Sequence, residues 1–247
     1  MTSPEGVMPA SAAANDPSVM DDIIEIFYAP SRVFARRRDN PKFWAAFFIL
    51  SILFAIGMWV MMRNYADVLD AQIRRQMEAQ MAKNPQMTAE MAEKGRHMGQ
   101  IIAPISGIIG GVIATLILGV GVWLVGKLFD SKADIRHGLM IATFASFPKV
   151  IDLILAAVGA LVVGTAGVTN MMAAGPSLAR FAPAGTSGTI IGLLSRFSIG
   201  TIWATILIAI GLHIAGRMTK GRAYGAAIVL WLIGTGLAVF SAMRQQG

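Results

Sequence analysis

Long runs of apolar residues constrain this chain more than any other feature. Five tracts are continuously apolar, and they fall at 43–62, 101–124, 139–167, 197–216 and 223–243. About 20 residues of α-helix cross the hydrocarbon core of a bilayer, which is ~30 Å thick. The tracts do not alternate apolar with polar residues, so helices are expected rather than barrel strands. The sequence therefore predicts an all-α, polytopic membrane helical bundle with five transmembrane helices.

The composition excludes several classes of protein. Hydrophobic residues make up 55% of the 247 residues and charged residues 14%, and the mean hydropathy is +0.61. A soluble domain carries about a quarter charged residues. The absence of cysteine excludes disulfides, thiolate metal sites and cysteine nucleophiles. The net charge of +7 is spread over polar loops, which in a membrane protein indicates topology and anionic lipid head groups rather than nucleic acid.

The chain before the first tract divides into two parts. Residues 1–22 are small, polar and acidic, so a disordered tail is expected rather than a cleavable signal. Residues 23–42 are expected to form an amphipathic cytoplasmic juxtamembrane segment. Ser18 is placed to cap its first helix, with Asp21 at the third helical position.

Arginines give the juxtamembrane segment two interpretations. Val33 and Phe34 stand beside a run of arginines at 36–38, and an apolar strip beside arginine fits a helix lying on anionic lipid head groups at the cytoplasmic face. The alternative is an ordinary positive flank that only orients the protein.

The distribution of Lys and Arg outside the tracts predicts the orientation. Eleven lie on the side of the N-terminus and eight on the other side, and six of those eight fall in the single loop 63–100, where acidic residues balance them. The Lys and Arg residues of the short loops therefore decide the predicted orientation. We expect a multi-pass protein of the bacterial inner or plasma membrane with a cytoplasmic N-terminus.

The loop 63–100 is charged but has a helical rhythm. Two apolar, methionine-rich stripes run through it, one before and one after Asn84-Pro85; their members are Leu69, Ile73, Met77 and Met81, then Met87, Met91, Met98 and Ile102. Methionine fills irregular apolar contacts. We expect an extramembrane helical hairpin whose stripes pack against each other and whose first arm projects about 30 Å if straight. The rival arrangement lays both stripes flat in the outer interface.

Small residues recur every four positions in the second tract. Gly107, Gly111, Thr115 and Gly119 form one ridge, and a second row of Ser106, Gly110 and Ala114 lies beside it. Small residues let helix backbones approach closely in lipid. The ridge is expected to pack within one chain, and the alternative is a homo-oligomer formed through this helix.

The stretch "FASFPKVIDLIL" at 144–155 places charges in an apolar tract. Proline suits the first turn of a helix, so a span of 148–167 starting at Pro148 would leave Lys149 and Asp152 near the interface. Lys149 would then snorkel to lipid phosphates and Asp152 would face the positive end of the helix dipole. In the alternative, one tilted helix buries the pair near mid-bilayer, with Arg196 as a third member of a transport site.

Motifs for catalysis are lacking. The three histidines, His97, His137 and His213, form no zinc-binding pair. No serine-hydrolase elbow and no phosphate-binding glycine loop occurs. The sequence therefore predicts a protein that is not an enzyme and has no catalytic, cofactor or metal site.

Two stretches resemble a known family. "FYAPSRVF" before the first tract and the Trp-centred "IWATILIAIGLHIAGRMTKGRA" in the fourth are similar to the Yip1 domain family of integral membrane proteins. Phe27-Tyr28-Ala29-Pro30 resembles that family's Leu-Tyr-Gly-Pro core, with Ala29 in place of Gly and Ile26 in place of Asp. Tyr28 and Pro30 are therefore candidate functional residues.

The resemblance implies a five-span Yip1-like membrane domain at 43–243 with a cytoplasmic N-terminus. Eukaryotic relatives act in vesicle trafficking and contact small GTPases. The function expected for this chain is a non-enzymatic role in membrane organisation or lipid interaction. The alternative is a small transporter or channel that uses Lys149, Asp152 and Arg196.

Overall fold

The computed structural model describes residues 18–84, 86–168, 170–183 and 185–244, and the regular elements within these ranges are all helices. In chain order the α-helices are α1 Val19–Glu25, α2 Pro30–Arg37, α3 Trp44–Asn64, α4 Ala66–Lys83, α5 Ala89–Leu128, α6 Ile135–Val162, α7 Gly188–Ser195, α8 Ile199–Ile214 and α9 Lys220–Arg244. Two short 3-10 turns, η1 Met171–Ala173 and η2 Leu178–Phe181, lie between α6 and α7.

Four of the described helices, α3, α5, α6 and α9, are long and apolar enough to cross a membrane. Helix α8 is apolar but has 16 residues, which is about 24 Å of helix and less than the ~30 Å of a hydrocarbon core. The all-helical membrane bundle expected from the sequence is confirmed. The count of five spans stays a prediction, because it depends on α8.

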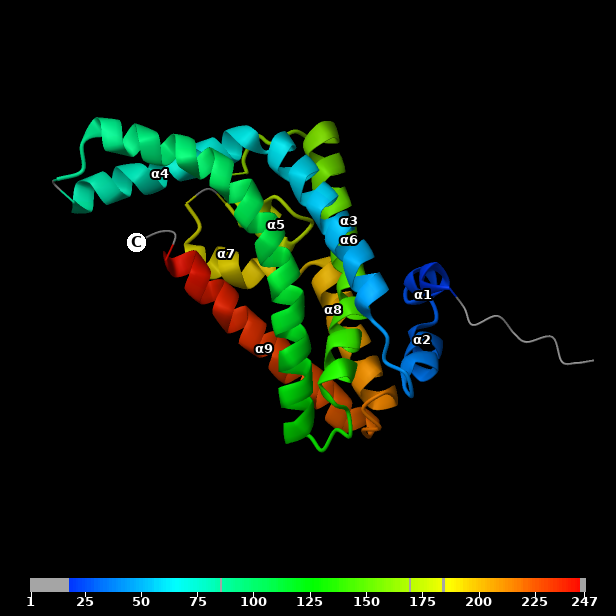
Figure 1. The fold of residues 1–247 in the computed structure, drawn as a ribbon. Coiled ribbons are helices and arrows are strands. Elements are labelled where there is room, and N and C mark those ends of the chain that lie inside the picture. The colour runs from blue at the N-terminus through cyan, green and yellow to red at the C-terminus, as the bar shows by residue number, and fades with distance from the viewer. Residues whose placement is uncertain (1–17, 85, 169, 184, 245–247) are drawn as a thin grey trace, which may run out of the picture.

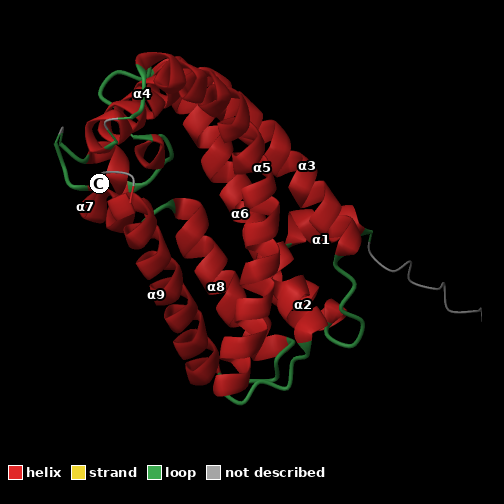
Figure 2. Ribbon diagram, turned by 60° about the vertical axis from the view of Figure 1, so that its left-hand side comes forward, coloured by secondary structure: helices red, strands yellow, loops and turns green. Residues whose placement is uncertain are grey.

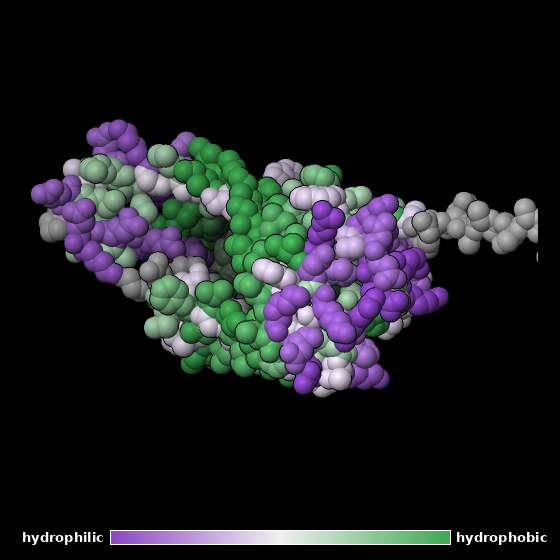
Figure 3. Space-filling model, turned by 60° about the horizontal axis from the view of Figure 1, so that its bottom comes forward, coloured by the Kyte–Doolittle hydropathy of each residue, from purple (hydrophilic) through white to green (hydrophobic). Residues whose placement is uncertain are grey.

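Helix α6 is the central helix of the bundle. It packs against α3, α5 and α8, and residues 140–148 are buried without interruption. Figures 1 and 2 show α3, α5, α6, α8 and α9 side by side, with α1 and α2 against one flank. Figure 3 shows hydrophobic surface between two polar regions, the arrangement expected of a protein that sits in a bilayer.

The bundle has two distinct ends. At one end, which we call the hairpin end, α3 passes into α4 and α5 returns (Figure 1). At the opposite end, which we call the loop end, the α5–α6 and α8–α9 turns meet, and Lys132 donates its backbone N–H to the Gly216 carbonyl at 3.0 Å.

The predicted division of the third tract at Pro148 is wrong. Helix α6 continues from Ile135 to Val162 with Pro148 inside it. A proline removes one helical hydrogen bond, but neighbouring helices compensate for this inside a membrane bundle. Pro148 lies in the fully buried part of α6, so packing on several sides holds the helix together where the local preference would end it. Lys149 and Asp152 are therefore not in a first helical turn.

Helix α4 lies against the first part of α5, and small residues make this contact. A Cβ atom on Gly99 would lie 3.1 Å from Ile73, and one on Gly95 would lie 3.0 Å from the sulfur of Met77. Met91 and Met98 instead point outward, 55% and 58% exposed. The expected contact between two methionine stripes is wrong, because glycine lets the arms approach more closely than two methionines would. In Figure 1 the paired arms run sideways across the hairpin end.

The glycine ridge of α5 packs within the chain. A Cβ atom on Gly107 would meet Met58 and Met62 of α3, and one on Gly111 would lie 4.0 Å from Phe54. A Cβ on Gly119 would lie 2.8 Å from the backbone of Leu139, so α5 and α6 approach closely there.

Candidate functional site

The central feature of the site is that α8 begins inside the bundle, against α6. The Asp152 carboxylate accepts a hydrogen bond from the backbone N–H of Gly200 at 2.9 Å and another from the Ser198 hydroxyl at 2.8 Å. The first N–H groups of a helix lack internal partners and carry partial positive charge. Asp152 therefore stabilises the N-terminus of α8 from a neighbouring helix. It does face the positive end of a helix dipole, as expected, but the helix is α8 rather than its own.

The local sequence explains why α8 starts there. Ser198 is extended and caps the helix, because its hydroxyl accepts the N–H of Thr201 at 3.1 Å. Gly200 permits the close approach, since a Cβ atom at this position would lie 2.5 Å from the Asp152 carboxylate and 2.7 Å from the Pro148 carbonyl. A β-bridge between Ser177 and Ser198 attaches the preceding loop at the same point.

Lys149 and Arg196 bring two positive charges to this point. Lys149 lies one helical turn before Asp152, and its ammonium is within electrostatic range of both the Arg196 guanidinium and the Asp152 carboxylate. No hydrogen bond or ion pair to that ammonium is found within the described part of the chain. The interfacial positions considered for Lys149 and Arg196 would have kept them apart, and the structure brings them together.

Arg196 is held between α7 and α9. It forms the C-cap of α7, and its guanidinium lies against Gly234 of α9, where a Cβ atom would be 3.0 Å away. Its Nε atom is buried and has no hydrogen-bond partner among the described residues. A buried guanidinium N–H without an acceptor is costly.

The arrangement has an excess of positive charge. Asp152 already uses both oxygens for Ser198 and Gly200. The buried Nε atom of Arg196 lacks an acceptor among the described residues, and so does the Lys149 ammonium. Both cationic residues are partly exposed, so a ligand can reach them. Chemically, the site can hold an anion with hydrogen-bond acceptors, such as a phosphate.

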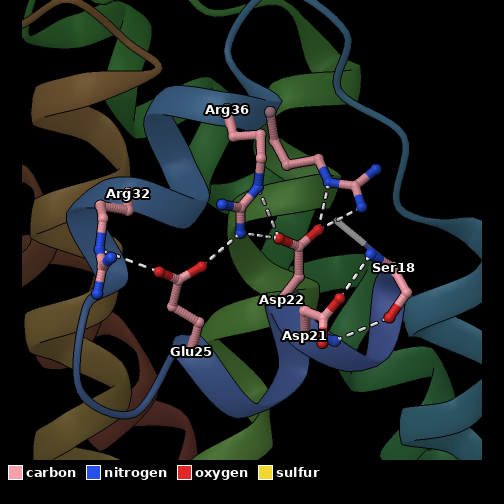
Figure 4. A network of polar contacts seen from close by, with 7 residues as sticks. Ser18, Asp21, Asp22, Glu25, Arg32 and Arg36 are labelled. Atoms are coloured by element: carbon pink, nitrogen blue, oxygen red, sulfur yellow. Dashed lines mark hydrogen bonds and ion pairs between the residues drawn. The ribbon is translucent and has the colours of Figure 1, made fainter. Parts of the chain in front are cut away.

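The juxtamembrane segment forms a separate charged cluster, the N-terminal clamp (Figure 4), made of Asp22 and Glu25 on α1 and Arg32, Arg36 and Arg37 on α2. The Asp22 side chain is fully buried and accepts hydrogen bonds from two arginines, while Glu25 binds Arg32 at 3.0 Å and Arg36 at 2.6 Å. Two of the arginines expected at lipid head groups are thus largely engaged within the protein.

The clamp is packed on the bundle. Val33 and Phe34 are fully buried, and α2 lies against α8. The predicted cap of α1 is confirmed, with Ser18 and Asp21 forming a reciprocal capping box. The predicted tail of residues 1–22 lies mostly outside the described residues, and α1 begins within its last part. Tyr28 is 69% exposed, and Pro30 occupies the first turn of α2.

His137 connects the clamp to α6. Its Nε2 atom lies 2.7 Å from the Arg38 carbonyl, and its other ring nitrogen lies 2.7 Å from the Asp134 carboxylate. Partial burial opposes ionisation of Asp134, but its hydrogen bonds with the backbone and ring of His137 outweigh this effect and lower the pKa of that carboxyl. His213 binds the Met218 carbonyl at 2.7 Å. Among the described residues no group of potential ligands is placed to hold a metal ion.

Sequence reasoning missed a second buried polar cluster at the hairpin end. Tyr65 is fully buried, and its hydroxyl lies 3.1 Å from the Ala174 carbonyl and accepts a hydrogen bond from Arg180 at 3.0 Å. Arg180 also donates to the Gly164 carbonyl at 3.3 Å. No local pattern connects a tyrosine at the end of one helix with an arginine 115 positions later. The cap at Ser198 was readable, since Ser198 precedes an apolar helical run.

The helical bundle and its internal charges define a polytopic integral membrane protein. The family model of the Yip1 domain matches residues 24–243, so this chain belongs to the Yip1 domain family and the predicted family is confirmed. A relative described as membrane protein YknW, from Bacillus subtilis (strain 168), is 27% identical over 221 residues, which cover 87% of this chain and 86% of that protein. None of the solved structures matches the chain.

Proposed function

We propose that this protein is a non-enzymatic, lipid-interacting membrane protein that binds an anionic phospholipid through Lys149 and Arg196. One observation carries the proposal: two cationic side chains from different elements lie within electrostatic range of each other inside the bundle without an acceptor in the described residues, beside a carboxylate that is already occupied. Charged groups within a membrane bundle are rare and mark functional sites. A lipid phosphate supplies the acceptors that the protein does not.

The depth of the site fits a lipid of the leaflet at the hairpin end. Leu153, next to Asp152, packs against Gly57, which precedes the end of α3 at Asn64 by seven residues, or about 10 Å of helix. Lysine and arginine have long apolar stems that carry their charge toward the interface. Lys149 lies four residues before Leu153 on α6, about 6 Å deeper, so the lipid phosphate has to be drawn into the bundle to reach both side chains.

The proposal includes an orientation. The N-terminus and the loop end are placed in the cytoplasm, α8 counts as a short fifth span, and the α4–α5 hairpin lies outside the membrane, as the charge bias of the short loops predicts. Because the clamp occupies Arg36 and Arg37, the exposed Lys42, Lys132 and Lys220 are the side chains proposed to contact anionic head groups at the cytoplasmic face. A homo-oligomer would use the exposed row of Ser106, Gly110 and Ala114.

Native mass spectrometry from nanodiscs tests the lipid site. The full chain in mixed phosphatidylglycerol and phosphatidylcholine should retain phosphatidylglycerol preferentially, and Lys149→Met and Arg196→Met should each reduce that preference severalfold. Lys42→Met, which removes one of the cations proposed at the cytoplasmic face, should reduce it much less. Equal retention by wild type and both site variants would contradict the proposal.

A small transporter or channel is the second candidate. It is favoured by the break between α7 and α8 at Ser198, inside the bundle. Helices that begin inside the membrane, with their N-termini at charged groups, form substrate sites in transporters, and α8 begins in this way at Asp152. Proteoliposome flux separates the two functions. Anion uptake that Arg196→Met abolishes would support transport, whereas lipid retention without flux supports the lipid site.

A further inference from the structure

A pocket lies at the hairpin end, between the end of α3, the start of α4 and the part of α5 that faces them. Its volume is about 300 Å³, and Trp59, Arg63, Asp70, Gln100 and Pro104 are among the residues that line it. None of these residues belongs to the Lys149–Arg196 site or to the clamp. The pocket is therefore a separate candidate binding site.

One wall of the pocket carries a positive charge. The Arg63 guanidinium lies over the Trp59 ring, 5.7 Å from its centre. Arg63 is exposed, and no carboxylate lies within ion-pair distance of it in the described ranges. The arginine is thus held in place by the indole and free to bind an anion.

Asp70, on α4, adds a negative charge with one available oxygen to the lining. Oδ1 of Asp70 accepts hydrogen bonds from Arg96 at 2.8 Å and Gln100 at 2.6 Å. Among the described residues, Oδ2 has only a distant contact with Arg74, at 3.9 Å. Hydrogen bonds from Arg96 and Gln100 lower the pKa of Asp70, so it is ionised at neutral pH. Its second oxygen can accept a hydrogen bond from a bound cation.

Exposed apolar side chains neighbour the pocket-lining residues along α3 and α5. Trp59 and Ile56, on one face of α3, are 55% and 56% exposed, and Ile101 and Ile105, which follow Gln100 and Pro104 on α5, are 54% and 53% exposed. These side chains provide a surface for acyl chains directly beside a pair of opposite charges. A water-soluble ligand would leave that surface unused.

We propose that this pocket binds the head group of a zwitterionic phospholipid with a primary amine, as in phosphatidylethanolamine, with its phosphate on Arg63 and its ammonium on Oδ2 of Asp70. Oδ2 needs an N–H donor, which a choline head group lacks. Arg63 already lies over one face of the Trp59 indole, where it would compete with a choline cation. An anionic lipid would satisfy Arg63 and leave Oδ2 of Asp70 without a close hydrogen-bond donor.

The experiment uses the full chain in nanodiscs that contain phosphatidylethanolamine and phosphatidylcholine with identical acyl chains, and native mass spectrometry measures the retained lipid. Wild type should retain phosphatidylethanolamine severalfold over phosphatidylcholine. Asp70→Asn should remove that preference, and Arg63→Gln should lower retention of both lipids. No preference in wild type, or an unchanged preference in Asp70→Asn, would overturn the proposal.

Three controls make the result specific. Arg96→Gln removes the ion pair between Arg96 and Asp70 but keeps the Asp70 carboxylate, so this variant should still prefer phosphatidylethanolamine. If Arg96→Gln loses the preference, folding of the hairpin and not the carboxylate decides binding. Lys149→Met and Arg196→Met should leave this preference intact, which separates the pocket from the anionic-lipid site. Excess soluble phosphoethanolamine should not displace the lipid, and displacement would show that the pocket recognises a free solute instead.

Discussion

Asp152, deep in α6, and Gly200, at the start of α8, are joined by a 2.9 Å hydrogen bond from the backbone N–H of Gly200 to the carboxylate. This contact fixes the point at which the chain turns back into the bundle, and it positions the turn that carries Arg196. A carboxylate in an apolar tract thus has a structural role, and the two cations beside it are the groups left for a ligand.

Removing the Asp152 carboxylate should destabilise the bundle. Asp152→Ala leaves the Gly200 N–H without its acceptor and the Ser198 hydroxyl with Thr201 alone, which should cost about 1–3 kcal/mol. Asp152→Asn keeps one acceptor oxygen and should cost less. Thermal unfolding in detergent, followed by tryptophan fluorescence, measures both. Asp152→Ala melting at the wild-type temperature would show that the cap contributes nothing.

Helix crossings at glycine should not tolerate a methyl group. In Gly138→Ala the new Cβ would lie 2.5 Å from the Gly119 carbonyl oxygen, and overpacking of this kind should cost about 1–3 kcal/mol. Gly110→Ala is the matched control, since no atom of the residues that the structure describes lies within 4 Å of its Cβ position. Thermal unfolding of the two variants should therefore differ clearly. Equal melting temperatures would mean that α5 and α6 are not this close.

Breaking the N-terminal clamp should release the juxtamembrane helices. Asp22→Asn removes the buried carboxylate from Arg37 and leaves Arg36 with Glu25 alone, and loss of hydrogen bonds between charged groups costs about 1.5–3 kcal/mol. Limited proteolysis should then cut near α2 much faster. Asp39→Asn, at a residue 72% exposed on its side chain, serves as the control and should behave as wild type. Equal cutting rates in both variants would count against the clamp.

The α4–α5 arms should separate in acid. Hydrogen bonds from Arg96 and Gln100 hold the pKa of Asp70 below its ordinary value. Such a carboxyl contributes stability that is present above its unfolded pKa, about 3.9, and lost as pH falls through the lower folded value. Spin labels at positions 78 and 94 should report a constant distance at neutral pH and a broader one below about pH 4. In Asp70→Asn this change should disappear, and its persistence would assign the transition to another group.

Reporter fusions test the orientation. Fusions after Met20 and Lys220 should read cytoplasmic, and fusions at Gln86 and Gly247 should read external, because lysine and arginine favour the cytoplasmic side. A cytoplasmic signal at Gln86 would place the hairpin on the other side and reverse the proposed leaflet.

Periodicity and length predicted most of the fold, because a bilayer leaves helices as the way to satisfy the backbone of an apolar tract. The start of α8 at Ile199 and the continuity of α6 through Pro148 show where this reasoning stops. Local preference ends a helix at proline, but packing of α3, α5 and α8 around it decides otherwise. The candidate site combines Lys149 and Asp152 of α6 with Arg196 at the end of α7. No local sequence pattern predicts that these two elements lie close together.

The most direct measurement of the central claim is the distance between lipid phosphorus and the two cations. Solid-state NMR in phosphatidylglycerol bilayers, with ¹⁵N-labelled lysine and arginine, detects dephasing of nitrogen by ³¹P, and Lys149→Met and Arg196→Met assign the signals. Lys149 Nζ and the Arg196 guanidinium should both show dephasing that corresponds to N–H···O contact, about 2.7–2.9 Å between nitrogen and oxygen. Absence of dephasing at both side chains, with dephasing at the exposed Lys132, would contradict the lipid site.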